Sequence, residues 1–274
     1  MPEGDSIFQL AHRLQFMVGR EVLGTDIRVP RFATVDFTAT TCTRVWPYGK
    51  HLFMQFGSTI LHTHLKMEGS WSMHRLGAKW RKPGHTARVV LRLADAAGPI
   101  ELVGHSLGFV RVFPAIEYAN HIAHLGPDIL SPDWPDSGAA EALRRITAVP
   151  DRTIGTALLD QRNVAGIGNE YRAEICFIAG IHPATVVADT DVAAVLGIGR
   201  KLMWANRMSP LRVTTGVRRA GESAYVFGRN GKPCRRCGTS IKKGELGGDY
   251  NDLERIIWWC PHCQPQQGLG PADL

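Results

Sequence analysis

The sequence has no long hydrophobic run. No stretch approaches the roughly 18 consecutive apolar residues that a helix needs to span a bilayer. Residues 1–20 do not read as a signal or transit peptide, because Glu3, Asp5, His12 and Arg13 interrupt any apolar core. We therefore expect a soluble, intracellular protein without a membrane partner.

The amino-acid composition also lacks the low hydrophobicity and high charge that are typical of disordered chains. Hydrophobic residues make up 44% and charged residues 21% of the chain, as in ordinary globular proteins. The 274 residues suffice for two modest domains, or for one large domain with an appended module. Internal repeats and low-complexity tracts are absent, so most of the chain should be ordered.

Acidic residues are too few to balance the basic ones. The formal net charge is +7 and the isoelectric point is about 9.3. Clustered cations gain free energy by displacing counterions from a polyphosphate, so nucleic acid is one interpretation and a solvated basic surface is the other. Residues 200–219 contain no acidic residue, and their basic residues are Arg200, Lys201, Arg207, Arg212, Arg218 and Arg219.

Cysteine is scarce, and most of it stands in two C-x-x-C pairs. The pairs are Cys234 with Cys237 and Cys260 with Cys263. Disulfides are not expected in a chain without an export signal. Four thiolates at this spacing close a tetrahedral Zn²⁺ site and leave no open position, so we predict one structural rather than catalytic zinc ion. The isolated Cys42 and Cys176 are expected to be small buried hydrophobes.

The N-terminal part has the pattern of a helix followed by short strands. Apolar residues at helical spacing predict a helix over residues 1–20 that ends near Gly19. Up to about residue 113, β-type runs separated by turns favour an antiparallel sandwich or barrel. The predicted strands are Val22–Ile27, His51–Phe56, Thr59–His64, Arg88–Leu93 and Ile100–Val103.

From about residue 114 the pattern becomes helical. Residues 126–135 contain several turn-forming residues and are interpreted as a connection between domains. We expect Asn169 to be the N-cap of one helix and Gly180 to follow its end. The predicted helices span residues 138–147, 153–161, 170–179 and 190–205.

A hairpin is expected between the two cysteine pairs. Leu253–Trp259 would form its returning strand and place Arg255 near the turn, where a guanidinium can bind a phosphate. Taken alone, such an arginine is more often solvated surface. The residues from Gln264 to Leu274 lack periodicity, and we expect a disordered tail there.

Four segments occur in a characteristic order. They are Pro2–Asp5, Pro47–Lys50, Ala165–Tyr171 and the four-cysteine ribbon. With them, the chain resembles the formamidopyrimidine-DNA glycosylase and endonuclease VIII family over residues 1 to about 264. The resemblance implies an α+β fold with an N-terminal antiparallel β-sandwich and flanking helices. A helical domain with a helix-two-turn-helix and a zinc-ribbon hairpin would follow. The expected domains are residues 1–120, 121–225 and 226–264, with 265–274 as the disordered tail.

The same resemblance implies a bifunctional DNA glycosylase and AP lyase of base excision repair. Removal of Met1 would leave Pro2 with a secondary amine, which attacks C1′ of the damaged nucleotide and opens the way to β,δ-elimination. An α-amino pKa of about 7.7 to 8.0 leaves a useful neutral fraction near neutral pH. By resemblance, Glu3 donates a proton to the deoxyribose, Lys50 binds phosphate and assists proton transfer, and Arg255 grips the phosphate beside the lesion. Without the resemblance, Glu3 reads as a helix-terminal charge and Lys50 as a surface lysine.

Chemistry at C1′ requires the nucleotide to leave the base stack, so other side chains must fill the gap. The resemblance points to Lys66 and Met67 in one loop and to Phe109 in a second. Met67 and Phe109 could equally be core residues. It also assigns a phosphate contact to Asn169, at the end of the turns Arg162–Gly168 that join two helices. Read alone, those turns are an ordinary glycine-containing loop.

Several positions depart from the formamidopyrimidine branch. The segment Gly104–Phe109 lacks the arginine pair with which that branch reads the opposite cytosine, and Gly155 replaces a lysine. Gly4 and Ala157–Gln161 are closer to endonuclease VIII, so oxidised pyrimidines are the expected substrates. Fewer contacts to the opposite strand also suggest activity on single-stranded or bubble DNA.

Two further departures, Ser6 and His124, leave lesion recognition open. The expected partner is damaged DNA, bound by a monomer in the bacterial cytoplasm at the nucleoid, and the sequence does not identify any protein partner. One alternative is a DNA-binding protein without catalysis, which the presence of Pro2, Glu3 and Lys50 disfavours. Nothing outside the ribbon supports a second alternative, a zinc-ribbon transcription or translation factor.

Overall fold

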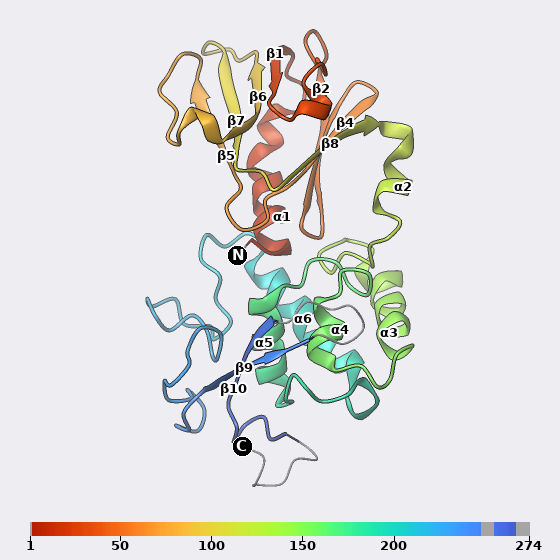
Figure 1. Cartoon of the computed structure of the whole chain (residues 1–274), viewed down its shortest axis with the longest axis vertical. Coiled ribbons are helices and arrows are strands. Elements are labelled where there is room, and N and C mark those ends of the chain that lie inside the picture. Colours follow the sequence, from red (N-terminus) through yellow and green to blue (C-terminus); the bar gives the residue numbers. More distant parts are fainter. Residues whose placement is uncertain (1, 248–254, 267–274) are drawn as a thin grey trace. The chain divides into compact units, whose positions relative to one another are not determined.

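The computed structural model describes residues 2–247 and 255–266. The chain divides into two compact units, Met1–His124 and Leu125–Leu274. Figure 1 traces the elements of each unit along the sequence. Within the described ranges, no helix is both long enough and apolar enough to cross a membrane.

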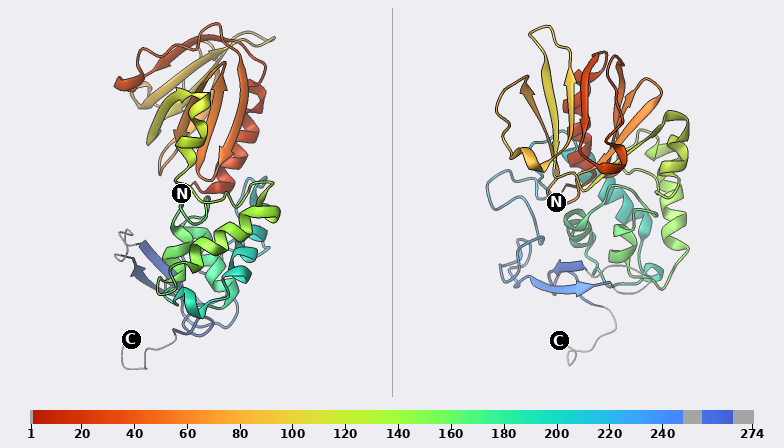
Figure 2. Two further views of the ribbon diagram at one scale, coloured as in Figure 1. Left: turned by 90° about the vertical axis from the view of Figure 1, so that its right-hand side faces the viewer. Right: turned by 45° about the horizontal axis from the view of Figure 1, so that its top comes forward.

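The first unit begins with helix α1, Gly4–Arg13, which continues as a 3₁₀ turn, Leu14–Met17. Its apolar side, including Ile7, Leu10 and Leu14, is buried in the core. Gly19 then adopts a positive φ of 84°, which a residue with a side chain rarely adopts. The predicted N-terminal helix and its end are confirmed, and Figure 2 shows α1 running along the strands.

Eight strands form two antiparallel four-stranded sheets. The first sheet has the order β1-β6-β7-β5 and the second has the order β2-β3-β4-β8. In the first sheet the strands are β1 (Val22–Ile27), β6 (Ala87–Leu93), β7 (Ile100–His105) and β5 (Ser70–Arg75). In the second they are β2 (Cys42–Tyr48), β3 (His51–Phe56), β4 (Thr59–His64) and β8 (Phe109–Pro114).

All five predicted strands are present, but three further strands were not predicted. The missed strands β2, β5 and β8 each lie at the edge of a sheet. Edge strands tolerate polar residues and proline, as Pro47 in β2 and Arg111 in β8 illustrate, so their alternation of apolar residues is weak. Phe109 is the first residue of β8, so the predicted second loop at this position is wrong.

Short helical segments complete the first unit. They are the 3₁₀ turns Pro30–Phe32, Gly84–Thr86 and Ala115–Glu117 and the helix α2, Tyr118–Ile122. Helix α2 packs through Tyr118 and Ile122 against Phe53 and Phe113 of the second sheet. The indole of Trp46 donates a hydrogen bond of 2.9 Å to the Tyr118 hydroxyl.

The second unit begins with helices. They are a π-helical turn (Trp134–Gly138), α3 (Ala139–Thr147), α4 (Ile154–Leu159), α5 (Asn169–Ala179), a 3₁₀ turn (Val187–Asp189) and α6 (Val192–Asn206). The four predicted helices are confirmed with small shifts of their ends. Gly180 ends α5 with a φ of 72°, as predicted. Asn169 is wrong as N-cap, because the extended Gly168 takes that position and Asn169 is already helical.

A hairpin follows, with strands β9 (Lys242–Leu246) and β10 (Arg255–Trp259). Arg255 pairs with Leu246 at one end of the ladder. Leu253 and Glu254 of the predicted strand lie outside the described residues, as does the predicted tail from residue 267. Disorder from Gln264 is wrong, because its buried side chain accepts from the Cys260 amide and donates to the Ile181 carbonyl.

Candidate functional site

The predicted nucleophile and its neighbour stand at the start of α1. Glu3 is the N-cap residue and is fully buried, and its carbonyl accepts from the amides of Ser6 and Ile7 at 3.0 and 3.2 Å. Pro2 precedes it and is half-buried. The helix terminus therefore fixes the backbone of Glu3 next to Pro2.

Lys50 lies in the two-residue turn between β2 and β3. Gly49, directly before it, has a φ of 54°, which lets the chain reverse tightly. Strand β3 starts at the next residue, His51, so the sheet register fixes the base of the lysine. The Lys50 side chain is half-buried.

A row of histidines, which the sequence reading missed, lies on the same face of β3 and β4. The ring nitrogens His51 Nδ1 and His62 Nε2 are 2.8 Å apart, and the rings of His51 and His64 are 4.9 Å apart. Burial, helped by neighbouring basic residues, lowers the pKa of His51 to about 4, of His62 to about 2 and of His64 to about 3. All three are neutral near pH 7. The histidines at alternate positions 62 and 64 of a predicted strand were the sequence signal that could have indicated this row.

The loop after β4 carries two of the predicted DNA-binding residues. His64 Nδ1 accepts a hydrogen bond of 2.8 Å from the Lys66 amide, and Lys66 has a positive φ of 54°. The Gly69 amide closes the loop onto the Leu65 carbonyl at 2.9 Å. Met67, at the tip, is 68% exposed, which excludes the core alternative for this residue.

Phe109, by contrast, is half-buried. Its ring meets the ring of His62 edge-on at 4.8 Å, and the Arg111 guanidinium lies 5.4 Å from its centroid. The neighbouring Gly108 is necessary where it stands, because a Cβ there would lie 2.2 Å from Lys66 Cγ. The loop of Lys66 and the start of β8 are therefore packed together.

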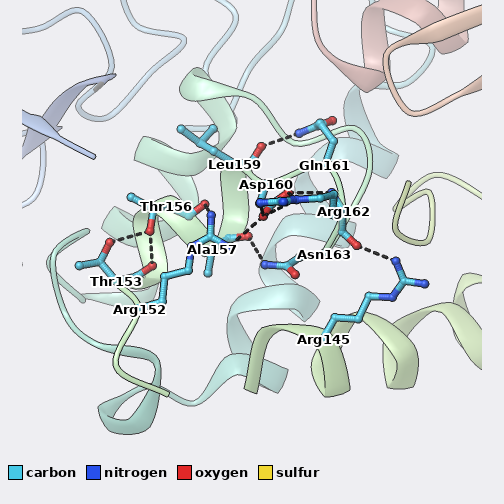
Figure 3. A network of polar contacts seen from close by, with 10 residues as sticks. All are labelled: Arg145, Arg152, Thr153, Thr156, Ala157, Leu159, Asp160, Gln161, Arg162 and Asn163. Carbon is cyan, nitrogen blue, oxygen red and sulfur yellow. Dashed lines mark hydrogen bonds and ion pairs between the residues drawn. The ribbon is translucent and has the colours of Figure 1, made fainter. Parts of the chain in front are cut away.

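In the second unit, the turns between α4 and α5 are held by polar side chains (Figure 3). The Gln161 amide donates to the carbonyls of Leu159 and Ile167 at 2.8 and 2.9 Å and accepts from the Gly166 amide at 3.0 Å. Asp160 accepts from Arg152 and Arg162 at 2.9 and 2.7 Å. Burial alone would raise its pKa, but these arginines lower the pKa of Asp160 to about 2.

Helix α5 and the hairpin meet beside two predicted DNA-binding residues. Asn169 Nδ2 donates 3.0 Å to the Ile256 carbonyl, and the buried Arg172 donates to the same carbonyl at 2.8 Å and to the Asn169 amide oxygen. Ile256 directly follows Arg255, whose side chain is exposed. The structure therefore brings the start of α5, at Asn169, next to the backbone of Arg255.

A buried carboxylate anchors the chain that leads into the ribbon. Glu174 of α5 accepts hydrogen bonds of 2.8 to 2.9 Å from the amides of Tyr225, Val226 and Phe227, and a further one from the Thr214 hydroxyl. Because the glutamate stands in a helix with no sequence signature, sequence reading missed it. The anchor fixes the segment before Cys234 against α5.

The four cysteines of the ribbon converge, with their sulfurs within 4.8 Å of one another. Cys234 and Cys263 are 3.9 Å apart at sulfur, and Cys237 and Cys260 are 3.5 Å apart. A tetrahedral ion with Zn–S bonds of ~2.3 Å would separate its sulfurs by about 3.8 Å. The cluster therefore fits a four-coordinate Zn²⁺ without an open position. By contrast, burial raises the pKa of Cys42 to about 11 and of Cys176 to about 12, as expected for inert thiols.

Two family models match the sequence. The formamidopyrimidine-DNA glycosylase N-terminal domain matches residues 1–103, and the formamidopyrimidine-DNA glycosylase H2TH domain matches residues 125–195. The range of the second match contains α4, α5 and the turns between them.

Curated relatives match over nearly the whole chain. A probable endonuclease 8 2 of Streptomyces coelicolor is 44% identical, with 99% of this chain and 95% of that protein covered. A protein of Mycolicibacterium smegmatis named DNA-(apurinic or apyrimidinic site) lyase Nei2 is 42% identical, with coverages of 96% and 99%. A solved complex of an inhibited LlFpg with N7-benzyl-Fapy-dG DNA has a TM-score of 0.78 at 21% identity. That match covers 97% of this chain and 100% of the other, and it shows a shared fold.

Proposed function

The chain belongs to the formamidopyrimidine-DNA glycosylase family, in its endonuclease VIII branch, and we propose on that basis that it is a DNA glycosylase and AP lyase of base excision repair. The observation that carries the proposal is identity of 42% over almost the full length to a protein named for AP lyase activity. The Pro2-Glu3 start at the buried N-cap of α1 is consistent with it.

The reaction we propose starts at Pro2 after removal of Met1. The neutral secondary amine attacks C1′ of the damaged nucleotide, the N-glycosyl bond breaks and the base leaves with a proton. Ring opening gives an iminium Schiff base, which makes the C2′ protons acidic. Loss of a C2′ proton expels the 3′ phosphate by β-elimination, and a second elimination expels the 5′ phosphate. Hydrolysis of the iminium returns the free amine.

Three side chains would assist this sequence. Glu3, held beside Pro2, would protonate the deoxyribose ring oxygen and then move protons during elimination. Lys50, on the β2–β3 turn, would bind phosphate and assist proton transfer. Arg255, exposed at the start of β10, would stabilise the phosphate that leaves in the second elimination.

DNA binding would engage both units. Lys66 and Met67 would occupy the gap left by the extruded nucleotide, with Phe109 supporting the loop. Asn169 would contact a phosphate at the N-terminus of α5, where backbone amides point outwards. The expected substrates are oxidised pyrimidines, because the arginine pair of the other branch is absent from Gly104–Phe109. Duplex DNA is the first substrate, and single-stranded or bubble DNA a further one.

The remaining assignments follow from this function. Residues 1–120 would form the catalytic domain, 121–225 the DNA-binding domain and 226–264 the ribbon, with one zinc ion held by the four cysteines. When bound, zinc would supply structural cross-linking of the hairpin and no chemistry. We also propose a monomer that works at the nucleoid in the bacterial cytoplasm.

Trapping with borohydride tests the proposed function. Incubation with duplex DNA that contains thymine glycol or an abasic site, in the presence of borohydride, should reduce the iminium to a stable protein–DNA crosslink. Mass spectrometry should locate that crosslink on Pro2. DNA binding without any crosslink would instead establish the non-catalytic alternative. Repeating the assay with the same lesion in a single strand tests the wider substrate range, and strict duplex dependence would exclude it.

A further inference from the structure

A basic segment of the first unit has no role in the proposed chemistry. Residues 75–93 contain no acidic residue. Their basic residues are Arg75, Lys79, Arg81, Lys82, Arg88 and Arg92. Three of these cations are concentrated in the exposed segment Leu76–Gly84, the basic loop, which follows edge strand β5.

The basic loop is anchored to the sheet rather than loosely solvated. The Trp80 indole donates a hydrogen bond of 3.0 Å to Glu101 Oε2 on β7. The Arg28 guanidinium lies 5.5 Å from the Trp80 ring centroid and donates 3.0 Å to the Gly84 carbonyl. Trp80 also meets the ring of His105 edge-on at 5.8 Å. These contacts reduce the conformational entropy that a partner would otherwise have to remove on binding.

The carboxylates next to the anchoring contacts, Glu101 and Asp26, are already paired. Glu101 bonds Trp80 and lies 3.1 Å from Arg92, and Asp26 lies 2.8 Å from Arg28. In the part of the chain that the structure describes, no carboxylate forms an ion pair with a cation of the basic loop. Arg81 extends the positive surface towards α1, because it lines a hollow there together with Arg13. An ordinary solvated surface would pair its cations with interspersed carboxylates. The cations of the basic loop form no such ion pair in the described residues, so they stay available to bind a polyanion.

The loop also lies beside the segment that we expect to enter the DNA. Lys82 Nζ is 3.5 Å from the Glu68 carbonyl oxygen, and Glu68 follows the exposed Met67. DNA held by Met67 would therefore bring its backbone within reach of the loop. We propose that the basic loop binds the sugar-phosphate backbone of the DNA next to the lesion, through Lys79 and Arg81. Lys82, in the same loop, would keep its contact with the Glu68 carbonyl. This inference rests on the proposed function, because that function supplies the DNA.

The salt dependence of binding measures such contacts. Each phosphate contact contributes roughly 0.9 to the slope of log K against log salt concentration for duplex DNA. The double variant Lys79→Ser with Arg81→Ser should therefore lower the magnitude of that slope by roughly 2. Fluorescence anisotropy with a duplex that contains a reduced, uncleavable abasic site gives the slope without interference from catalysis.

A matched control separates local contacts from bulk charge. The double variant Arg31→Ser with Arg44→Ser removes the same charge from exposed positions outside every proposed DNA contact. Its slope should equal that of the wild type. An unchanged slope in the Lys79 and Arg81 variant, or an equal fall in the control, would overturn the proposal.

Two further measurements make the result specific. Trp80→Phe keeps the ring but removes the N–H donor to Glu101, so it should weaken binding without changing net charge. Borohydride trapping by the control variant Arg31→Ser with Arg44→Ser should match the wild type, since neither residue contacts the DNA or takes part in the chemistry. A wild type that binds DNA with the expected slope but never crosslinks would refute the proposed function and leave the binding inference intact.

Discussion

Glu3 is the N-cap residue of α1 and also the sequence neighbour of the proposed nucleophile, Pro2. Its backbone supports α1 through the Ser6 and Ile7 amides, whereas the proposed chemistry uses only its carboxylate. Glu3→Gln keeps the backbone and the shape of the side chain but removes the proton donor. We expect single-turnover base excision and strand cleavage to fall by about 10² to 10⁴-fold.

Binding and stability controls accompany that variant. Glu3→Gln should bind an uncleavable abasic duplex as the wild type does and should melt at a similar temperature. An excision rate within a few-fold of wild type would rule out Glu3 as the acid, whereas loss of folding would appear in the melting temperature.

The histidine row predicts how stability depends on pH. The pKa of His62 in the folded protein is about 2, and that of an unfolded histidine is about 6.5. As pH falls below about 6.5, the unfolded state therefore binds the proton first, so this stability is present above that pH and is lost below it. For His62 alone, the loss is about 2 kcal/mol at pH 5.

Urea unfolding at pH 7.5 and pH 5 measures this loss, and His62→Phe provides the comparison. The variant lacks the titrating group in a site already surrounded by Phe53, Phe109 and Phe113, so its stability should fall less steeply with acidification. Equal pH slopes for both proteins would contradict the assignment.

Individual elements differ in how far the sequence determined them. The inner strands predicted from apolar runs, such as His51–Phe56 and Thr59–His64, have the predicted ends because they are packed on the core. Edge strands such as β5 have one partner and an open side, so tertiary pairing rather than pattern decides them. The cysteine set was predictable because metal ligands have a fixed spacing. The Glu174 anchor and the histidine row were not, because they depend on contacts between distant segments.

The turns of the helix-two-turn-helix give a prediction of their own. Gly166 has a φ of 112°, and a Cβ there would lie 3.2 Å from Ile129 Cγ2. Gly166→Ala should therefore destabilise the protein by about 1 to 3 kcal/mol. It should also weaken DNA binding, because a backbone shift at residue 166 would displace the amide that donates to the Gln161 side chain, which supports both turns.

Gly197 offers the matched control for this substitution. It lies in α6, and nothing is within 4 Å of where its Cβ would stand. Gly197→Ala should raise stability by about 0.5 to 1 kcal/mol through helix propensity. Chemical denaturation of both variants provides the test. If Gly166→Ala were as stable as Gly197→Ala, the turn would not require the positive φ.

The proposed zinc site affects the net charge of the whole chain. Four ionised thiolates and one Zn²⁺ would carry a combined charge of about minus two, so a bound zinc ion would reduce the formal net charge from +7 to about +5. The remaining positive charge still favours association with DNA at low salt. Burial of Cys234 and Cys260 together with Val226 and Phe177 means that the same cluster supports the core of the second unit.

Removal of zinc should therefore affect the two units differently. With a chelator, the four thiolates would repel one another. The segment Tyr225–Cys234, which Glu174 holds at one end, would then lose the metal that holds its other end. We expect hydrogen exchange to accelerate in residues 226–247 and 255–266 while β3 and β4 stay protected. Affinity for an uncleavable abasic duplex should fall together with that protection, because Arg255 is held on the ribbon. Added Zn²⁺ should restore both. A chelated protein that keeps full affinity would show that the ribbon contributes nothing to binding.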